Sequence, residues 1–427
     1  MTAPQSLLTV PLMARKVPAI VGHLTYSRVE LPNGQKRLAG RYALYPDIDL
    51  GRFKTRAVID WLAVGISLKR ATQFQWLQSE IAGILGRTPF VKNRQGKPND
   101  SSDSFEVRFQ EPEMATVLKA MAAIEARYGI EKPPIVSSIE ISVDFTPRVP
   151  SDLERAKIAR VLMNHLLVEE DVISNIRERP RTVWGRDERS VARLIYDSKR
   201  LTAEENKRFL IETERDRAPF TDGTLEIGAK EANVRWRVMD KIIDRQNVRA
   251  GTCVVLGEAE KRARIEVTLD QPEVEALGIT FLNDLKHLNF TRLQGRYFRF
   301  FLPTFTGDAA RDPGRKSALL LWRDRQRATK FGKGGGLSLK AMDRALAEQH
   351  AEIKRNALQD FHRQGLRLPG GNRTGRGLAG SFVAYEELNE RTRTALRSLG
   401  SRIVAGFEWE KEGEVGAEEG LERIRIS

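Results

Sequence analysis

Three stretches between Thr224 and Leu269 alternate apolar and polar residues, and this pattern constrains the fold more than any other feature of the 427-residue chain. They read Thr-Leu-Glu-Ile-Gly (224–228), Val-Arg-Trp-Arg-Val-Met-Asp-Lys (234–241) and Arg-Ile-Glu-Val-Thr-Leu (264–269). A period of two is typical of strands that place one face on a core. The stretches therefore predict an antiparallel sheet with a buried apolar face and a charged, exposed face, and the exposed face is where we expect a working surface.

The charge and cysteine content limit the classes of partner and compartment. Lys and Arg number 71 against 57 Asp and Glu, and the formal net charge of +14 suits a polyanionic partner such as nucleic acid. The single Cys253 excludes an intramolecular disulfide and a cysteine-built zinc site. No apolar run approaches the ~20 residues of a membrane helix, and the N-terminus lacks a signal-peptide pattern. We expect a cytoplasmic protein with no membrane partner.

The order of strand-like and helix-like stretches predicts an α+β fold, built from two linked strand–helix units with an antiparallel or mixed sheet and a helical C-terminal region. Within a core over 57–305, helices are expected near 72–85 and 112–128, and Ser151-Asp-Leu-Glu154 has the spacing of a capping box. Outside that core we expect an N-terminal arm or strands at 1–56, a basic Gly-rich linker at 306–337, a helical region at 338–400 and an acidic tail at 401–427.

Four carboxylates interrupt the apolar strands, namely Asp60, Glu140, Asp144 and Glu266. Each alone is an ordinary solvated residue, but carboxylates gathered on one sheet face repel unless a divalent cation or a basic group lies among them. We therefore predict a Mg²⁺ or Mn²⁺ ion held by these oxygens, which could polarise a phosphodiester. Lys241, beside Arg237 on its strand, could supply positive charge to the scissile phosphate.

Basic residues elsewhere are candidates for DNA contact. Arg235 and Arg237 share the charged strand face, and Arg193 and Lys199 flank Tyr196. Arg296 and Arg299 alternate with aromatic residues in the run 296–301, a pattern that can stack on bases, although its phenylalanines fit a core better.

Several common catalytic motifs are missing from the sequence. The five histidines form no close pair, so the His-x-His pattern of the commonest DNA-nicking enzymes is absent, and so is the Gly-x-Ser-x-Gly motif of hydrolases. The run Gly-Lys-Gly-Gly-Gly at 332–336 lacks the ending of a phosphate-binding P-loop. Histidine-based metal chemistry is therefore not expected.

Over roughly 58–305 the chain resembles the replication initiation factor family, the rolling-circle initiators of small plasmids and filamentous phages and the related relaxases of conjugative elements. The resemblance is carried by five short motifs, each weak alone but in the same order: Val58-Ile-Asp-Trp-Leu, Ser138-Ile-Glu-Ile-Ser-Val-Asp-Phe145, Thr224-Leu-Glu-Ile-Gly228, Val238-Met-Asp-Lys241 and Arg264-Ile-Glu-Val267. It implies a protein that binds an origin, as single-stranded or hairpin DNA, and nicks one strand through a tyrosine. Asp144 and Glu266 would then serve the metal and Lys241 the phosphate.

One departure from the family affects the nucleophile. Where the family has Tyr-Asp/Glu-Lys, this sequence has Met239-Asp240-Lys241, and methionine cannot attack a phosphate as an oxygen nucleophile. Another tyrosine could substitute, with Tyr196 as the first choice and Tyr297 as the second. Alternatively, the protein binds an origin or a specific site without cutting it.

Two further alternatives stay open at this stage. The chain could be an unrelated RNA- or DNA-binding structural protein whose strand pattern is accidental. If it is an initiator, a host helicase and a polymerase are candidate partners and a homodimer is a candidate assembly, while the sequence leaves the oligomeric state open. The sequence does not distinguish a plasmid, a phage and an integrative element as its origin.

Overall fold

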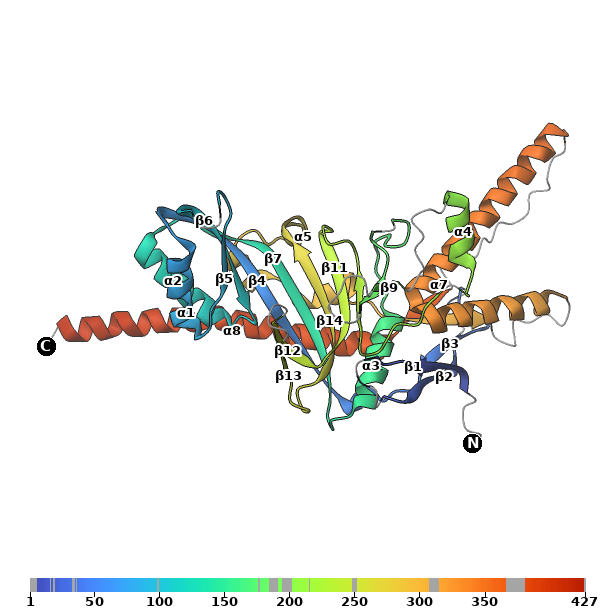
Figure 1. Ribbon diagram of the computed structural model, residues 1–427, viewed down its shortest axis with the longest axis horizontal. Coiled ribbons are helices and arrows are strands. Elements are labelled where there is room, and N and C mark those ends of the chain that lie inside the picture. The colour runs from blue at the N-terminus through green and yellow to red at the C-terminus, as the bar shows by residue number, and fades with distance from the viewer. Residues whose placement is uncertain are drawn as a thin grey trace.

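The computed structural model describes residues 6–425 except 16, 18–19, 33–34, 36, 98–99, 176, 184–190, 194–201, 215, 248–251, 307–314 and 366–380. A large sheet lies at the centre of the molecule, and the long helix α8 (Glu386–Arg425) runs past it (Figure 1). The mixed content of helices and antiparallel sheets confirms the predicted α+β class.

The large sheet is antiparallel at every pairing between its strands. In spatial order its strands are β5 (Phe90–Asn93), β6 (Ser102–Gln110), β4 (Phe53–Thr72), β7 (Ile130–Pro147), β14 (Arg262–Asp270), β11 (Val234–Lys241), β10 (Thr224–Ile227), β8 (Arg181–Val183) and β9 (Val191–Arg193). The three alternating stretches of the sequence are β10, β11 and β14, as predicted. β14 lies between β11 and β7, so strands from both predicted units join in one sheet.

A second sheet joins the two ends of the chain. Its strands, in order, are β1 (Ser6–Leu12), β2 (Gly22–Glu30), β3 (Arg41–Pro46), β15 (Phe301–Thr306) and β16 (Phe382–Ala384). The N-terminal region is therefore built of strands, one of the two forms expected for it. The loop between β11 and β14 forms a separate hairpin of β12 (Ile243–Asn247) and β13 (Thr252–Val255).

The helices follow local signals in the sequence. They are α1 (Phe74–Leu85), α2 (Met114–Tyr128), α3 (Asp152–His165), α4 (Ala203–Ile211), α5 (Gln271–Ala276), α6 (Phe290–Tyr297), α7 (Arg315–Arg363) and α8, with 3-10 turns at Leu50–Arg52 and Leu282–His287. The Ser151 side chain caps α3 by accepting a hydrogen bond from the Glu154 amide at 3.3 Å, as its spacing predicted. Gly86 ends α1 in the left-handed conformation, with φ 66°.

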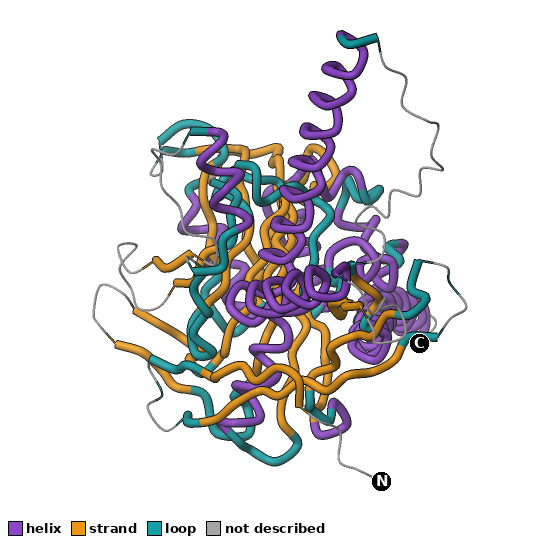
Figure 2. Tube along the Cα trace, turned by 90° about the vertical axis from the view of Figure 1, so that its right-hand side faces the viewer, coloured by secondary structure: helices purple, strands orange, loops and turns teal. Residues whose placement is uncertain are grey.

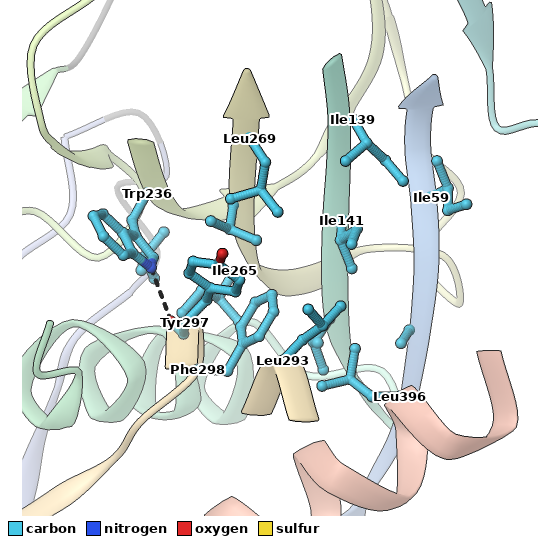
Figure 3. Close-up of a cluster of buried hydrophobic side chains, with 14 of the residues drawn as sticks. Ile59, Ile139, Ile141, Trp236, Ile265, Leu269, Leu293, Tyr297, Phe298 and Leu396 are labelled. Atoms are coloured by element: carbon cyan, nitrogen blue, oxygen red, sulfur yellow. Dashed lines mark hydrogen bonds between the residues drawn. The ribbon is translucent and has the colours of Figure 1, made fainter. Parts of the chain in front are cut away.

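Helices pack against the apolar face of the large sheet. Ile59, Ile141 and Ile265 project from three neighbouring strands toward Leu293 of α6 and Leu396 of α8, and all five side chains are buried (Figure 3). Trp236 of β11 joins this core and donates from its indole nitrogen to the carbonyl of Tyr297 at 2.8 Å. The aromatic run 296–301 thus serves the core, with Phe298 and Phe300 fully buried.

Two expected boundaries differ in the structure. The predicted linker at 306–337 is largely helical, because α7 begins at Arg315 and two helices meet at a kink where Gly335 takes φ 71°. The second of these helices projects away from the rest of the molecule (Figure 2). The last helix was expected to stop at Gly400, but α8 continues through it and into the predicted acidic tail at 401–427 as far as Arg425. Gly400 lies against Phe290, so close packing accounts for a glycine inside this helix.

None of the described helices is both long enough and apolar enough to cross a membrane.

Candidate functional site: the polar face of the large sheet

The face of the large sheet opposite the helices carries charged and polar side chains, and we call it the polar face. Antiparallel register aligns its residues across β7, β14 and β11. Arg264 pairs with Asp144 and Met239, Glu266 pairs with Ser142 and Arg237, and Thr268 pairs with Glu140 and Arg235. Residues directly opposite one another on antiparallel strands are close enough to interact, so three strands supply one continuous surface.

Arg264 lies at the centre of this surface with only 1% of its area exposed. Its guanidinium donates to both oxygens of Asp144, at 2.5 and 2.8 Å, and also bonds Asp60. Burial lowers the pKa of Arg264, but Asp144 and its other carboxylate neighbours outweigh that effect and raise it, so the group stays charged. Arg262 adds a second cation to Asp144 at 3.0 Å. Asp144 is therefore held mainly by arginines.

The remaining three predicted metal ligands form a group of their own, which we call the carboxylate cluster: Asp60, Glu140 and Glu266. One oxygen from each of the three carboxylates lies within 4.8 Å of the others, and they come from β4, β7 and β14. Asp60 reaches this face because a β-bulge inserts it between Ile59, which pairs with Ile141, and Trp61, which pairs with Glu140.

Glu140 has the most perturbed environment in the carboxylate cluster. Burial and the neighbouring Glu266 raise its pKa to about 7, against the opposing effect of Arg237. Its Oε2 accepts from the Thr268 hydroxyl at 2.6 Å, whereas its buried Oε1 has no hydrogen-bond partner among the described residues. For Asp60, burial acts to raise the pKa, but Arg264 and Lys241 outweigh it and hold the pKa below its ordinary value.

Lys241 and Arg237 border the carboxylate cluster, in agreement with their predicted places. The Lys241 ammonium lies 3.7 Å from Asp60. Arg237 donates to Glu266 at 2.6 Å and lies 3.5 Å from Glu140, while 42% of its side chain stays exposed. Met239 stands on the same face between them in sequence, opposite Arg264. Met239, the position at which the sequence resemblance implies a tyrosine, is thus on the polar face.

Other predicted site residues lie elsewhere. Arg235 is on the polar face but engaged with Asp270 at 2.7 Å and with two backbone carbonyls. Arg296 pairs with Glu273 and Arg299 with Glu169, both away from the carboxylate cluster. Tyr297 is in the core on the apolar side of the sheet, where burial and a hydrogen bond to Glu273 raise the pKa of its hydroxyl, so it is wrong as a nucleophile for this face.

Some predicted residues fall outside what the structure describes. Tyr196 and Lys199 lie in the range 194–201, which is not described, and of Arg193 only the backbone of β9 is described. The strand pattern did not predict the role of Arg264, although it places this arginine on the charged face. Its position opposite Asp144 depends on the pairing of β14 with β7, which are 120 residues apart at that point.

The sequence predicted a sheet face that is both charged and exposed. The face is charged, but the residues at its centre are buried. Glu140, Asp144, Arg264 and Glu266 are each at least 94% buried. Guanidinium groups lie between the carboxylates and cover them, which is how the sheet keeps like charges on one surface. What remains exposed is the border of the cluster, including Arg237.

Comparisons with known proteins add no family assignment. No family model matches this sequence, and no curated protein matches it. Among solved structures, the class II 3-hydroxy-3-methylglutaryl-CoA reductase from Streptococcus pneumoniae bound to NADPH in open conformations is similar at 12% identity, over 96% of this chain and 89% of that chain, with a TM-score of 0.16. A likeness at that TM-score carries no argument about fold or function. The candidate function rests on the residues of the polar face.

Proposed function

We propose that this protein is a replication initiator of a mobile element, which binds origin DNA on the polar face and nicks one strand there in a cation-dependent reaction. The observation that carries the proposal is the carboxylate cluster itself. Three strands from distant parts of the chain bring Asp60, Glu140 and Glu266 together, with ligand oxygens within 4.8 Å of one another. Arg264, Arg237 and Lys241 offset part of this acidic charge, and Glu140, whose pKa is raised to about 7, is the member they offset least.

A divalent cation fits the donor set of this cluster. The donors are all carboxylate oxygens, which Mg²⁺ and Mn²⁺ prefer. The buried Oε1 of Glu140 accepts no hydrogen bond among the described residues and has Arg237 Nη2 3.5 Å away. A bound ion would polarise the phosphodiester as a Lewis acid.

Basic side chains beside the cluster are suited to hold the phosphate. Lys241 is within reach of Asp60, and Arg237 is partly exposed next to Glu266. Both would neutralise charge on a phosphate at the cluster and stabilise it further as it develops in the transition state.

The nucleophile we propose is Tyr196, since Met239 cannot serve and Tyr297 faces the core. In the step, the tyrosine hydroxyl gives up its proton as its oxygen bonds to phosphorus, while the bond from phosphorus to the 3′ oxygen breaks. The released 3′ oxygen takes a proton, and the 5′ phosphate stays on the tyrosine, so the bond energy is kept for rejoining.

The decisive experiment is a nicking assay on supercoiled DNA that carries the gene with its flanks, in the presence of Mn²⁺. We expect a nicked product with a covalent adduct that protease removes on a denaturing gel, and mass spectrometry of the adduct should identify Tyr196. Glu266→Gln should abolish nicking. Glu226→Gln is the matched control, because Glu226 lies on β10, separated from Glu266 by β11, and pairs with Arg181 outside the cluster.

A second candidate function is origin binding without cleavage, and the specific observation that favours it is Met239 on the polar face. DNA that is shifted by the protein but stays intact with Mn²⁺ would support this second function and contradict the first. Binding that weakens steeply with salt would show that phosphate contacts dominate it.

A further inference from the structure

We propose that Trp61, Arg108 and Phe90 form a stacking platform for the unpaired bases of a single DNA strand, next to the carboxylate cluster. The inference deepens the proposed function, on which it rests, by naming the form of the substrate. These three residues lie on β4, β6 and β5 at the other end of the polar face from β11.

The bulge in β4 brings the platform to the cluster. Because Asp60 is the extra residue, Trp61 keeps its place opposite Glu140, so a ligand of the cluster and an indole ring are consecutive residues on one face. Leu62 then points into the core and is fully buried. A DNA strand with a phosphate at Asp60 would therefore lie beside the indole ring of the next residue, Trp61.

Arg108 joins the two rings of the platform. Its guanidinium carbon lies 4.2 Å from the centre of the Trp61 ring and 5.9 Å from that of Phe90. The Arg108 Nε is buried and has no hydrogen-bond partner among the described residues. Phe90 is 54% exposed, so one face of its ring is open to a ligand. Rings and guanidinium planes of this kind are surfaces on which bases stack.

The charge around the platform suits a polyanionic strand. Lys92 and Arg94 lie beside it, and Glu106, 2.8 Å from Lys92, is the acidic neighbour that offsets one of them. Arg94 crosses the sheet over Gly65, where a β-carbon would come within 2.6 Å of its guanidinium, so the glycine leaves room for this cation. Together with Arg108, the patch has a net positive charge next to its exposed ring.

Unpaired bases are the ligand that this chemistry fits. In a duplex the flat faces of the bases are already stacked on one another, whereas those of a single strand are free to stack on Trp61, Arg108 or Phe90. Stacking needs no particular base, so binding should tolerate changes of sequence.

The test measures fluorescence anisotropy of a labelled oligothymidine and of a labelled hairpin duplex, with EDTA present so that no cation contributes. Trp61→Ala and Phe90→Ala should each weaken binding of the single strand about tenfold and leave duplex binding nearly unchanged. Trp61→Phe should retain binding, which shows that an aromatic ring is what matters. Trp76→Ala is the matched control, since Trp76 is an exposed tryptophan on α1.

A second measurement does not depend on the folding of a variant. Photo-crosslinking of the wild-type protein to an oligonucleotide containing 5-iododeoxyuridine should label the peptides that contain Trp61 or Phe90. Labelling confined to other peptides would overturn the platform, and so would unchanged affinity of Trp61→Ala or equal losses on single strand and duplex.

The stacking platform and the nicking function can be disproved independently of each other. Nicking by the wild-type protein together with binding that is independent of Trp61 would overturn the platform alone. Binding that depends on Trp61, with no nicking under any divalent cation, would support the platform and overturn the cleavage function.

Discussion

At the scale of single residues, the charge of each buried carboxylate on the polar face depends on how completely nearby cations neutralise it. Arg264 serves Asp144 and Asp60 together, and Arg237 serves Glu266 and lies near Glu140. Among the four acids, Glu140 has the negative charge that nearby cations neutralise least, and its pKa is accordingly raised to about 7. It is therefore the residue whose charge should respond to pH and to a bound cation.

Replacing Glu140 by Gln should change how stability depends on pH. The ordinary pKa of this carboxyl is 4.5 and the folded value is about 7, so between these values the folded state binds more protons and stability falls as pH rises. Gln stays neutral and still offers an oxygen to Thr268. We expect the Tm of Glu140→Gln, relative to wild type, to rise from about pH 5 to about pH 8. A difference in Tm that is flat across this range would contradict the assignment.

Binding of Mn²⁺ should release a proton near neutral pH. Because Glu140 must be deprotonated to act as a ligand, affinity should rise as pH increases through about 7. Titration calorimetry in two buffers of different ionisation enthalpy measures the proton directly. Asp60→Asn should remove the binding, and Glu226→Gln should keep it, since Glu226 is outside the cluster.

At the scale of elements, two glycines inside helices show how closely those helices pack against their neighbours. Gly83 and Gly406 are the two residues, and their surroundings differ. A β-carbon at Gly83 of α1 would meet nothing within 4 Å, whereas one at Gly406 of α8 would lie 2.8 Å from the β-carbon of Met114. The second glycine lets α8 approach α2.

Alanine at these two glycines should therefore have opposite effects. Gly83→Ala should stabilise the protein by about 0.5–1 kcal/mol, because alanine is the better helix former. Gly406→Ala has the same gain in propensity but should be destabilising overall, since α8 would have to move away from α2. Urea unfolding of the two variants beside wild type gives both signs, and stabilisation by Gly406→Ala would show that the contact is looser than the structure has it.

The link between α3 and β11 is a buried ion pair on the apolar side of the sheet. Arg155 bonds Asp240, and both side chains are at most 2% exposed. Asp240→Asn should cost about 3–5 kcal/mol in the free energy of unfolding, because it leaves a buried guanidinium poorly compensated. Asp152 pairs with the same arginine at 2.7 Å but is 39% exposed, so Asp152→Asn should cost at most about 1 kcal/mol. Equal costs in chemical denaturation would mean that burial does not distinguish the two partners.

At the scale of the whole molecule, α8 is part of the central core although it comes last in the chain. Its buried residues Leu388, Leu396, Leu399, Ile403 and Phe407 pack in the same core as the central strands of the large sheet. Strand β16, just before it, completes the second sheet against β15. The C-terminal part of the chain therefore closes the fold.

Truncation at two points should separate the structural part of α8 from the rest. Ending the chain after residue 408 retains every buried side chain that the structure describes in α8, so the Tm should stay within a few degrees of wild type. Ending it after residue 381 removes β16 and α8, and should leave a protein without a cooperative thermal transition. A cooperative transition in the shorter chain would show that the core closes without α8.

Local patterns of the sequence determined most of the elements of this fold. The alternation in 224–269 predicted β10, β11 and β14 and the sign of their two faces, because side chains on a strand alternate with a period of two. The spacing of Ser151 and Glu154 predicted the start of α3, and Gly86 the end of α1. The same periodicity singled out Asp60, Glu140, Asp144 and Glu266 as acids in apolar strands.

Only the tertiary structure decided which of those acids meet. Asp144 opposes Arg264 and becomes an ion-pair partner, while a bulge in β4 turns Asp60 toward Glu140 and Glu266. Pairing of β7 with β14 and with β4, strands that are distant in the sequence, fixes both outcomes, and no local pattern encodes that register. The same holds for Tyr297, where an isolated sequence pattern suggested a nucleophile and the packing of α6 beneath the sheet made it a core residue. The burial of the charged face also depended on the tertiary structure, because guanidinium groups cover the carboxylates only when strands distant in the sequence lie side by side.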